Sequence, residues 1–455
     1  MAVKIEEDCY RSFQGMSWRD DIDVGDFILS NVRPYHGDSS FLAGPTERTS
    51  RLWRICRDLQ IEEHDRGGVY KIDPHTVQAI TSFPPGYIDR DLEIIVGLQT
   101  DELLKRAVNP FGGIRMADNA CRQYGEEIDP KMKEIFMKYR VTHNDGVFMV
   151  YTKEMRRLRH FGILTGLPDS YGRGRIIGDY RRVPLYGIDQ LIAGKEADLN
   201  SPELLRIDNE EKVRLREEVR QQINSLHDIK KMAEAYGFDI SSPAMNGRDA
   251  VQWLYFAYLA AVKQQNGAAM SLGRVSAFLD IYLERDIDEG TLNEQQAQEL
   301  IDDFAIKLRI TRHLRTKEYD EVFAGDPNWI TESIGGMAND GRTLVTKTSY
   351  RMLHTLENLG PAPEPNMTVL WAQDLPRKFK EYCGRISIAT CTLQYENDDL
   401  MRPIFGDDYG IACCVSAMKL GKQMQFFGAR CNLPKLLLLA LNGGRDENTG
   451  LEIGP

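Results

Sequence analysis

Hydrophobic residues recur at helical spacing in two long stretches of the chain. Between 209 and 236 the apolar residues fall on one stripe surrounded by charged residues, and Gly237 follows as a helix stop. This stripe consists of Leu215, Val219, Ile223, Leu226 and Ile229. A second helix is predicted over 293–315, where Thr291 and Glu294 have the spacing of a capping box. Its apolar face consists of Ala297, Ile301, Phe304, Leu308 and Leu314. We expect both helices to pack against a core.

From 343 onward, short apolar runs alternate with turns and helical stretches. The runs cover 367–371, 386–389 and 411–415. Runs of this length are typical of buried strands in an α/β protein, where strand ends and loops carry the functional site. The first 150 residues combine short helical patterns with turn signals, and we expect irregular helices there. The chain has no internal repeat and no linker that forces a domain boundary.

Composition narrows the class of protein. The 455 residues are 42% hydrophobic, which is enough for one large domain or for two to three smaller ones. A net charge of -11 argues against a general nucleic-acid surface, although a few local Arg residues can still bind small anions. The longest apolar run, 436–441, is too short to cross a bilayer, and residues 1–8 lack the apolar core of a signal peptide. We therefore expect a cytoplasmic protein.

Cys413 and Cys414 are adjacent in the chain. The planar peptide bond between them prevents a disulfide without distortion of the backbone. No C-x-x-C pair occurs among the eight cysteines, so reduced thiols are expected and a zinc ribbon is not. In an extended segment the two side chains would leave on opposite faces, so that one sulfur meets a substrate while the other meets a different group, as in a relay. The alternative is that both act as small apolar core residues.

Motifs for several common chemistries are missing from the chain. It has no phosphate-binding P-loop, no H-E-x-x-H, no G-x-S-x-G and no iron–sulfur spacing, and no His lies near the Cys pair in sequence. The run 171–182 is rich in Gly and Arg, which suits an anion site, a solvated basic loop, or Arg residues paired with the acidic surface. Arg430 follows two aromatic residues, which suits either an apolar pocket with one charged end or a buried ion pair.

Seven segments of the chain together resemble one family. They are LTGLPDSYGRGRIIGDYRR at 164–182, QNGAAMSLGR at 265–274, TESIGGM at 331–337, EPNMTVLW at 364–371, LQYENDDLMRP at 393–403, IACCVS at 411–416 and GKQMQFFGAR at 421–430. Over essentially all its length the chain resembles the pyruvate formate-lyases, the formate acetyltransferases among the glycyl radical enzymes. Motifs of this length and composition are specific to the family.

The resemblance implies an acyltransferase that cleaves pyruvate with coenzyme A to acetyl-coenzyme A and formate in anaerobic glucose metabolism. It implies that Cys413 is the thiyl that adds to the pyruvate carbonyl carbon and then carries the acetyl group. Cys414 would be the relay that receives the radical from a glycyl radical. The implied pocket residues are Arg175 and Arg430 for the carboxylate, and Ala268, Phe323 and Trp329 for the walls. No tightly bound cofactor and no metal are implied. The implied partners are a radical S-adenosylmethionine activating enzyme and, for the intact enzyme, a second copy of the chain.

The fold implied by the resemblance is an α/β barrel of ten strands in two parallel five-stranded halves. We expect a helical N-terminal region over about 1–150 and the barrel over about 151–455. The family carries its radical on a Gly in an R-V-S-G-Y type loop near the C-terminus, and no such loop is present in this sequence. The nearest string, 274–278, has Ala277 where Gly is needed. We therefore expect a C-terminally truncated fragment that lacks the glycine radical domain, is inactive without it and is poorly stable.

Two other functions remain open from the sequence. One is a related enzyme, either a 2-oxobutanoate formate-lyase or a glycyl radical dehydratase or decarboxylase, although the Cys doublet argues against a dehydratase. One methylene is worth only about 1–3 kcal/mol of discrimination, so the motifs do not separate pyruvate from 2-oxobutanoate. The other is a non-catalytic partner chain that regulates an intact homologue.

Overall fold

The structure is a computed structural model of the whole chain. It describes residues 9–109, 114–139, 151–164, 175–265, 270–323, 328–414, 416–425 and 431–454. Within these ranges, the side chains of a few residues next to the gaps are not described: Arg175, Ile176, Gln265, Tyr319, Val322, Phe323 and Gln425.

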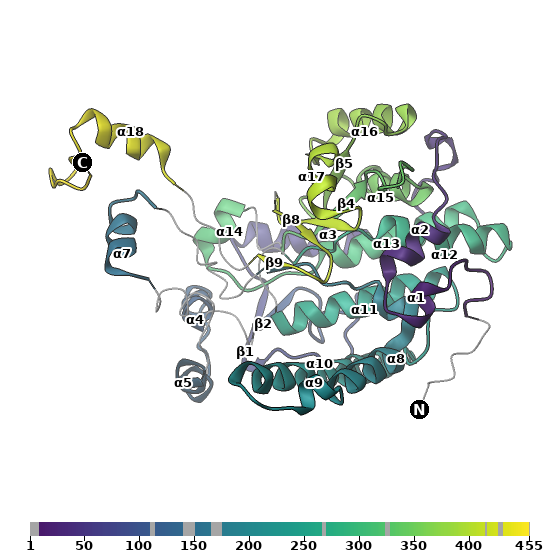
Figure 1. Cartoon of the computed structure of the whole chain (residues 1–455), viewed down its shortest axis with the longest axis horizontal. Helices are drawn as coiled ribbons and strands as arrows, with labels where there is room; N and C mark the ends of the chain where they lie inside the picture. Colours follow the sequence, from purple (N-terminus) through teal and green to yellow (C-terminus); the bar gives the residue numbers. More distant parts are fainter. Residues whose placement is uncertain are drawn as a thin grey trace.

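Helices make up most of the described chain (Figure 1). In the first half they are α1 (Ser17–Asp20), α2 (Val24–Asn31), the 3-10 helix η1 (Ser39–Phe41), α3 (Glu47–Asp65), α4 (Ile114–Gln123), α5 (Pro130–Tyr139), α7 (Lys153–His160), α8 (Arg182–Leu199), α9 (Pro202–Leu205) and α10 (Glu210–Ala235). In the second half they are α11 (Gly247–Gln265), α12 (Ser276–Asp288), α13 (Glu294–Arg309), α14 (Lys317–Phe323), α15 (Lys347–Asn358), α16 (Arg377–Thr390), α17 (Asp398–Phe405) and α18 (Leu433–Leu441).

The described strands form one three-stranded sheet and three pairs. The sheet is parallel, with the order β4 (Thr331–Gly335), β5 (Asn366–Trp371), β6 (Leu393–Asn397). The pairs are parallel β1 (Lys71–Val77) with β2 (Lys105–Val108), antiparallel β3 (Arg175–Ile176) with β9 (Met424–Gln425), and antiparallel β7 (Tyr409–Ala412) with β8 (Ser416–Lys419). This is the mixed α/β fold that we expected, and β1 and β2 add a strand pair to the N-terminal region that was expected to be helical. The ten-stranded barrel remains a prediction.

Both long helices predicted from periodicity are confirmed. α10 covers the first stretch, with Val219 and Ile223 buried, and Gly237 follows it with a positive φ of 87°. α13 covers most of the second, but its capping box is formed by Asn293 and Gln296 and not by the predicted pair. The N-cap, and with it the first helical residue, therefore lies two positions later than the predicted capping box indicated.

The predicted strand over 386–389 is wrong, because these residues form the last turn of α16. Ile386 is fully buried whereas Ile388 is 85% exposed. Residues two apart point to the same face of a strand but to nearly opposite faces of a helix, so this burial pattern fits the helix. The run 367–371 is confirmed as part of β5. The run 411–415 is confirmed only at its start, because β7 ends at Ala412 and Cys413 and Cys414 lie in the turn that follows.

One large core joins the N-terminal region to the rest of the chain. Phe13 packs edge-on against Tyr282 with ring centroids 5.1 Å apart, and Phe27 lies 5.6 Å from Phe278. Aromatic pairs at these distances contribute beyond the apolar area that they bury. Residues from α2, α8, α11, α12, α13, α15 and α16 belong to the same core cluster. The predicted division into regions 1–150 and 151–455 is not tested by this core and stays a prediction.

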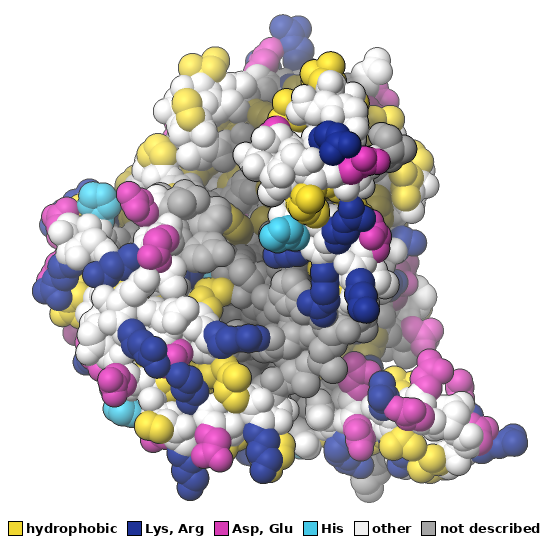
Figure 2. Space-filling view, turned by 90° about the vertical axis from the view of Figure 1, so that its left-hand side faces the viewer, with side chains coloured by type: hydrophobic (Ala, Val, Ile, Leu, Met, Phe, Trp, Pro, Cys, Tyr) yellow, Lys and Arg dark blue, Asp and Glu magenta, His cyan; other side chains and the backbone are white. Residues whose placement is uncertain are grey.

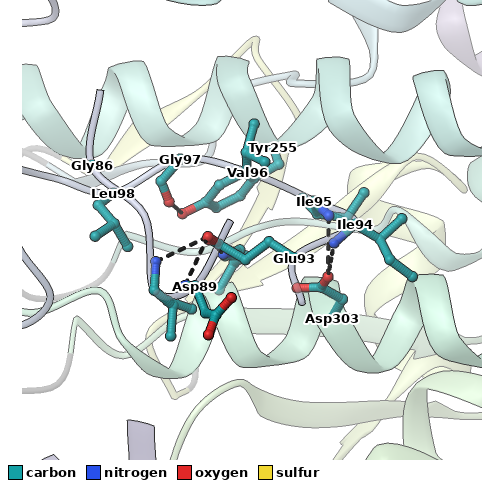
Figure 3. Close-up of polar contacts among 12 residues, drawn as sticks. Gly86, Asp89, Glu93, Ile94, Ile95, Val96, Gly97, Leu98, Tyr255 and Asp303 are labelled. Carbon is teal, nitrogen blue, oxygen red and sulfur yellow. Dashed lines mark hydrogen bonds and ion pairs between the residues drawn. The ribbon is translucent and has the colours of Figure 1, made fainter. Parts of the chain in front are cut away.

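A segment without regular structure, 86–98, crosses this core and is held by side chains of the helices (Figure 3). We call it the 86–98 strap. Asp303 Oδ2 accepts hydrogen bonds from the N–H groups of Ile94 at 2.6 Å and Ile95 at 3.1 Å, and the Tyr255 hydroxyl donates to the Gly97 carbonyl at 2.9 Å. Further partners are the Tyr236 hydroxyl and the Gln252 side chain. Buried backbone groups need such partners where no sheet or helix supplies them.

The surface mixes both signs of charge with separate apolar patches. Figure 2 shows Lys and Arg side chains interspersed with Asp and Glu over one face. α18 is among the most apolar exposed elements, with Leu433 at 70%, Leu437 at 61% and Leu441 at 74% exposure. No helix among the described residues is long and apolar enough to cross a membrane.

Candidate active site at the tip of the β7–β8 hairpin

Cys413 and Cys414 lie in the turn that joins β7 to β8. The hairpin is antiparallel, and Ala412 pairs with Ser416 at its end. Cys413 has a φ of 61°, in the left-handed region that residues with a Cβ seldom adopt. Cys413 is 6% exposed, whereas Cys414 is exposed. The two side chains therefore do lie in different surroundings, as expected. The cause is a left-handed turn at Cys413 and not an extended strand.

Four side chains hold the backbone of the Cys turn. The Cys413 N–H donates to Ser271 Oγ at 2.9 Å. Its carbonyl accepts from the Thr331 hydroxyl and, at 3.5 Å, from Asn366 Nδ2. The Gln394 side-chain amide donates to the Cys414 carbonyl. Thr331 and Asn366 begin β4 and β5, and Gln394 is the second residue of β6, so the turn is seated at the amino edge of the parallel sheet.

The base of the hairpin is fixed by an ion-pair cluster. The Arg181 guanidinium donates to both carboxylate oxygens of Asp408 at 2.8 Å, and to Asp179 at 2.8 Å. Asp408 directly precedes β7. Loss of hydration is the largest influence and raises the pKa of the Asp408 carboxyl, but the charge and hydrogen bonds of Arg181, together with the charges of Arg274 and Lys422, hold that pKa below its ordinary value. The bidentate pair therefore stays ionised and fixes β7 against the segment that follows β3.

The segment that carries Arg175 is joined to the same hairpin. Arg175 is in β3, opposite Gln425 of β9. Just beyond it, Ile177 packs with Ala412 in a small buried cluster, and its carbonyl accepts from the Gly421 N–H at 2.8 Å. The backbone of Arg175 thus belongs to the unit that carries the Cys turn, although the position of its side chain is outside the described structure.

Trp329, a predicted pocket residue, is half-buried beside buried polar groups. It has a positive φ of 47°, and the Arg315 guanidinium lies 5.4 Å from the ring centroid. Arg315 Nε–H donates to His313 Nε2 at 2.6 Å, so the His313 Nδ1–H donates to Asn328 Oδ1, 2.8 Å away. The main-chain carbonyl of Asn328 accepts a hydrogen bond from the Met270 N–H at 3.0 Å. These contacts connect Trp329 to the segment that contains Ser271.

Two buried carboxyls flank the start of the sheet. Burial raises the pKa of Glu332 to about 8, and burial likewise raises the pKa of Glu364 to about 8. Glu332 Oε1 accepts from the N–H groups of Val275 and Ser276, both at 2.9 Å, at the start of α12. Glu364 Oε2 accepts from the Ile330 N–H at 2.7 Å. Both carboxyls are hydrogen-bonded to backbone and can be protonated at neutral pH, which removes most of their charge from the site.

The other predicted site residues lie at or beyond the edge of the described structure. Phe323 is the last residue of α14, and its side chain is not described. Ala268 and Arg430 lie outside the described residues. Their roles remain predictions.

Sequence reasoning gave no role to Ser271, Thr331, Asn366 or Gln394. Each lies inside one of the seven quoted segments, which is the signal that could have pointed to them. Their hydrogen bonds to the Cys turn span 142, 82, 47 and 20 residues, so no local spacing reveals them.

Comparison with known proteins supplies the family. The family model "Pyruvate formate lyase-like" matches residues 16–455. The chain belongs to the pyruvate formate lyase-like family. A formate acetyltransferase of Haemophilus influenzae is 56% identical to this family member over 451 residues, covering 98% of the chain and 58% of the relative. The chain thus spans less than two thirds of the length of this curated relative.

Two solved structures share the fold of this family member. A glycerol dehydratase from Clostridium butyricum matches 92% of the chain and 60% of its own length, with a TM-score of 0.71 and 22% identity. A glycyl radical enzyme from Archaeoglobus fulgidus matches 90% of the chain and 58% of its own length, with a TM-score of 0.65 and 18% identity. At these identities the likeness establishes the fold alone.

Proposed function

We propose that this chain carries the cysteine-bearing part of a formate acetyltransferase, which converts pyruvate and coenzyme A to acetyl-coenzyme A and formate. The observation that carries the proposal is the pair of adjacent thiols in one turn, with Cys413 buried and Cys414 exposed. A buried sulfur suits the acyl carrier because water is kept from the thioester, and an exposed sulfur suits the relay that receives the radical. The 56% identity to a formate acetyltransferase supports the same chemistry.

Thiyl chemistry explains why the site does not need a base. Heterolytic cleavage of the carbon–carbon bond of pyruvate needs an electron sink, which a cofactor such as thiamine usually supplies. Addition of the Cys413 thiyl to the carbonyl carbon forms a C–S bond and leaves the unpaired electron on oxygen. Cleavage of the C1–C2 bond then restores the carbonyl as a thioester on Cys413 and moves the unpaired electron to the carboxyl fragment, which becomes formate on taking a hydrogen atom from a thiol. The thioester passes its acetyl group to the thiol of coenzyme A.

The remaining parts of the site are proposed on the family resemblance. Arg175 and Arg430 would orient the pyruvate carboxylate with parallel N–H···O bonds, and Ala268, Phe323 and Trp329 would form the walls. Antiparallel pairing of β3 with β9 supports a common site for the two Arg residues, since β9 ends five residues before Arg430.

The family resemblance also supports the larger arrangement. We propose that β4, β5 and β6 belong to the ten-stranded barrel of two parallel halves, over about 151–455, next to the N-terminal region of about 1–150. A radical-bearing glycine domain, a radical S-adenosylmethionine activating enzyme, pairing into a homodimer, and a cytoplasmic location complete the proposal.

Formate production tests the function directly. The chain is combined under anaerobic conditions with a glycine radical domain, the activating enzyme, pyruvate and coenzyme A. We expect formate release from the unchanged chain and none from Cys413→Ser, because a hydroxyl in place of the thiol does not give a thiyl radical or a thioester. Cys391→Ser, which changes another exposed thiol, is the matched control and should keep the activity. Formate release that persists in Cys413→Ser would contradict the proposal.

A further inference from the structure

The left-handed turn at Cys413 is what separates the surroundings of the two thiols. Cys413 is one of four described non-glycine residues with a positive φ. That conformation is unfavourable for a residue with a Cβ and persists only where its surroundings fix it. Relaxation of φ to a negative value would rotate the Cys413–Cys414 peptide and alter the directions of both sulfurs. The groups that hold this peptide therefore control which of the two thiols is buried and which is exposed.

Thr331 is the best placed of these groups. Its side chain is fully buried, and its hydroxyl donates to the Cys413 carbonyl, the group that sets the orientation of the Cys413–Cys414 peptide. The backbone of Thr331 is itself fixed. Its carbonyl accepts from the N–H groups of Leu272 at 2.9 Å and Gly273 at 3.1 Å, and it pairs in register with Asn366.

Ser271 completes the clamp on the other side of Cys413. Ser271 Oγ accepts a hydrogen bond from the Cys413 N–H at 2.9 Å. The next residue, Leu272, donates its N–H to the Thr331 carbonyl. The Ser271 hydrogen bond thus fixes the peptide before Cys413 and the Thr331 hydrogen bond fixes the peptide after it, and the backbones of these two segments are themselves hydrogen-bonded. Asn366 Nδ2 adds a longer hydrogen bond of 3.5 Å to the same Cys413 carbonyl. A residue between two fixed peptides has little freedom in φ and ψ.

We propose that Thr331 is a positioning residue whose hydroxyl holds Cys413 in the left-handed conformation, and so keeps the Cys413 thiol in the interior and the Cys414 thiol at the surface. The effect on catalysis rests on the proposed function. The effect on the placement of the two thiols does not, and it can be measured without any turnover.

Three variants distinguish the effect of the Thr331 hydroxyl from the effect of side-chain packing. Thr331→Val keeps the shape and removes the donor, and Thr331→Ser restores the donor without the methyl group. Thr368→Val is the matched control, since Thr368 is a fully buried threonine of the neighbouring strand whose hydroxyl has no hydrogen-bond partner in the described structure. Each folded variant is treated with substoichiometric iodoacetamide, and the modification of Cys413 and Cys414 is read by fragment mass spectrometry.

In the unchanged protein and in Thr368→Val we expect Cys414 to be modified much faster than Cys413. Loss of one hydrogen bond in Thr331→Val should narrow this ratio by about fivefold or more, and Thr331→Ser should restore it. With the radical system supplied, Thr331→Val should lower kcat and leave KM for pyruvate nearly unchanged, because the carboxylate-binding Arg residues are untouched.

The outcomes distinguish the two proposals. An unchanged ratio in Thr331→Val overturns the positioning role, and so does an equal change in Thr368→Val or a failure of Thr331→Ser to restore the ratio. The ratio can shift as expected in Thr331→Val while the unchanged protein releases no formate with the complete radical system. That result supports the positioning role and overturns the proposed function.

Discussion

At the residue scale, Glu332 couples the site to pH. It follows Thr331 in β4, is fully buried, and caps α12 through Oε1, while Oε2 has no hydrogen-bond partner in the described structure. Burial raises its pKa from the ordinary 4.5 to about 8. Between these two values the folded protein holds a proton on Glu332 that the unfolded chain has released. Its contribution to stability is therefore complete below about pH 4.5 and is lost as the pH rises through about 8.

We predict that Glu332→Gln flattens this part of the pH profile. The amide keeps an oxygen for the two N–H groups of α12 but does not titrate. The free energy of unfolding of the unchanged protein should fall between pH 6 and 7.5 more steeply than that of the variant, by roughly 1.4 kcal/mol per pH unit. Urea unfolding at several pH values measures both slopes, and Glu364 cancels from the comparison because it is present in both proteins. Parallel slopes would mean that Glu332 is ionised in the folded protein.

At the element scale, the 86–98 strap depends on side chains for backbone hydrogen bonds that a helix or strand would make within the main chain. Asp303 of α13 satisfies two consecutive N–H groups, those of Ile94 and Ile95 (Figure 3). Burial raises the pKa of Asp303 to about 6, so the carboxylate is largely ionised at neutral pH. Its charge is balanced nearby by Lys307, which also pairs with Glu93 where both side chains are fully buried.

Asp303→Ala should therefore destabilise the protein strongly. The N–H groups of the half-buried Ile94 and the buried Ile95 lose their acceptor, and loss of a buried acceptor costs about 1–3 kcal/mol. Asp303→Asn retains a carbonyl oxygen at the same position and should lose much less. Denaturant unfolding gives the free energies, and amide hydrogen exchange at Ile94 and Ile95 shows whether the strap opens. Equal losses in the two variants would assign the effect to the charge and not to the hydrogen bonds.

The strap also shows where sequence reasoning reaches its limit. α10 could be predicted because its apolar stripe is local, and the strand that leads into the Cys turn could be predicted because the apolar run 411–415 includes its end. The strap could not, since its hydrogen bonds connect Ile94 to Asp303, 209 residues away, and Leu98 to Tyr236, 138 residues away. Ser271 and Thr331, which hold Cys413, could not be predicted for the same reason, because their hydrogen bonds to it span 142 and 82 residues. At 386–389 the apolar run was too short to distinguish a strand from the end of a helix.

At the scale of the whole molecule, the two helices that pack against β5 and β6 carry exposed apolar side chains. In the described part of the chain β6 pairs with β5 alone, α16 packs against β6 and α17 against β5. Ile388 of α16 is 85% exposed, and Leu400 and Ile404 of α17 are 67% and 69% exposed. An unpaired strand edge and exposed apolar side chains each favour association with other chains.

We predict that the 455-residue chain alone self-associates through the edge of β6 and these apolar side chains. Its net charge of -11 opposes association, so added salt should strengthen association by screening the repulsion. The double variant Ile388→Lys with Ile404→Lys should shift the chain toward monomer, since it places two charges among the exposed apolar side chains of the helices that pack against the sheet. Ile61→Lys on α3, where the side chain is 50% exposed, is the control for charge alone and should leave association unchanged. Sedimentation velocity over a range of concentration and salt measures these differences. A chain that stays monomeric at every concentration and unfolds cooperatively would show that the edge of β6 is protected, and would argue against the expected poor stability.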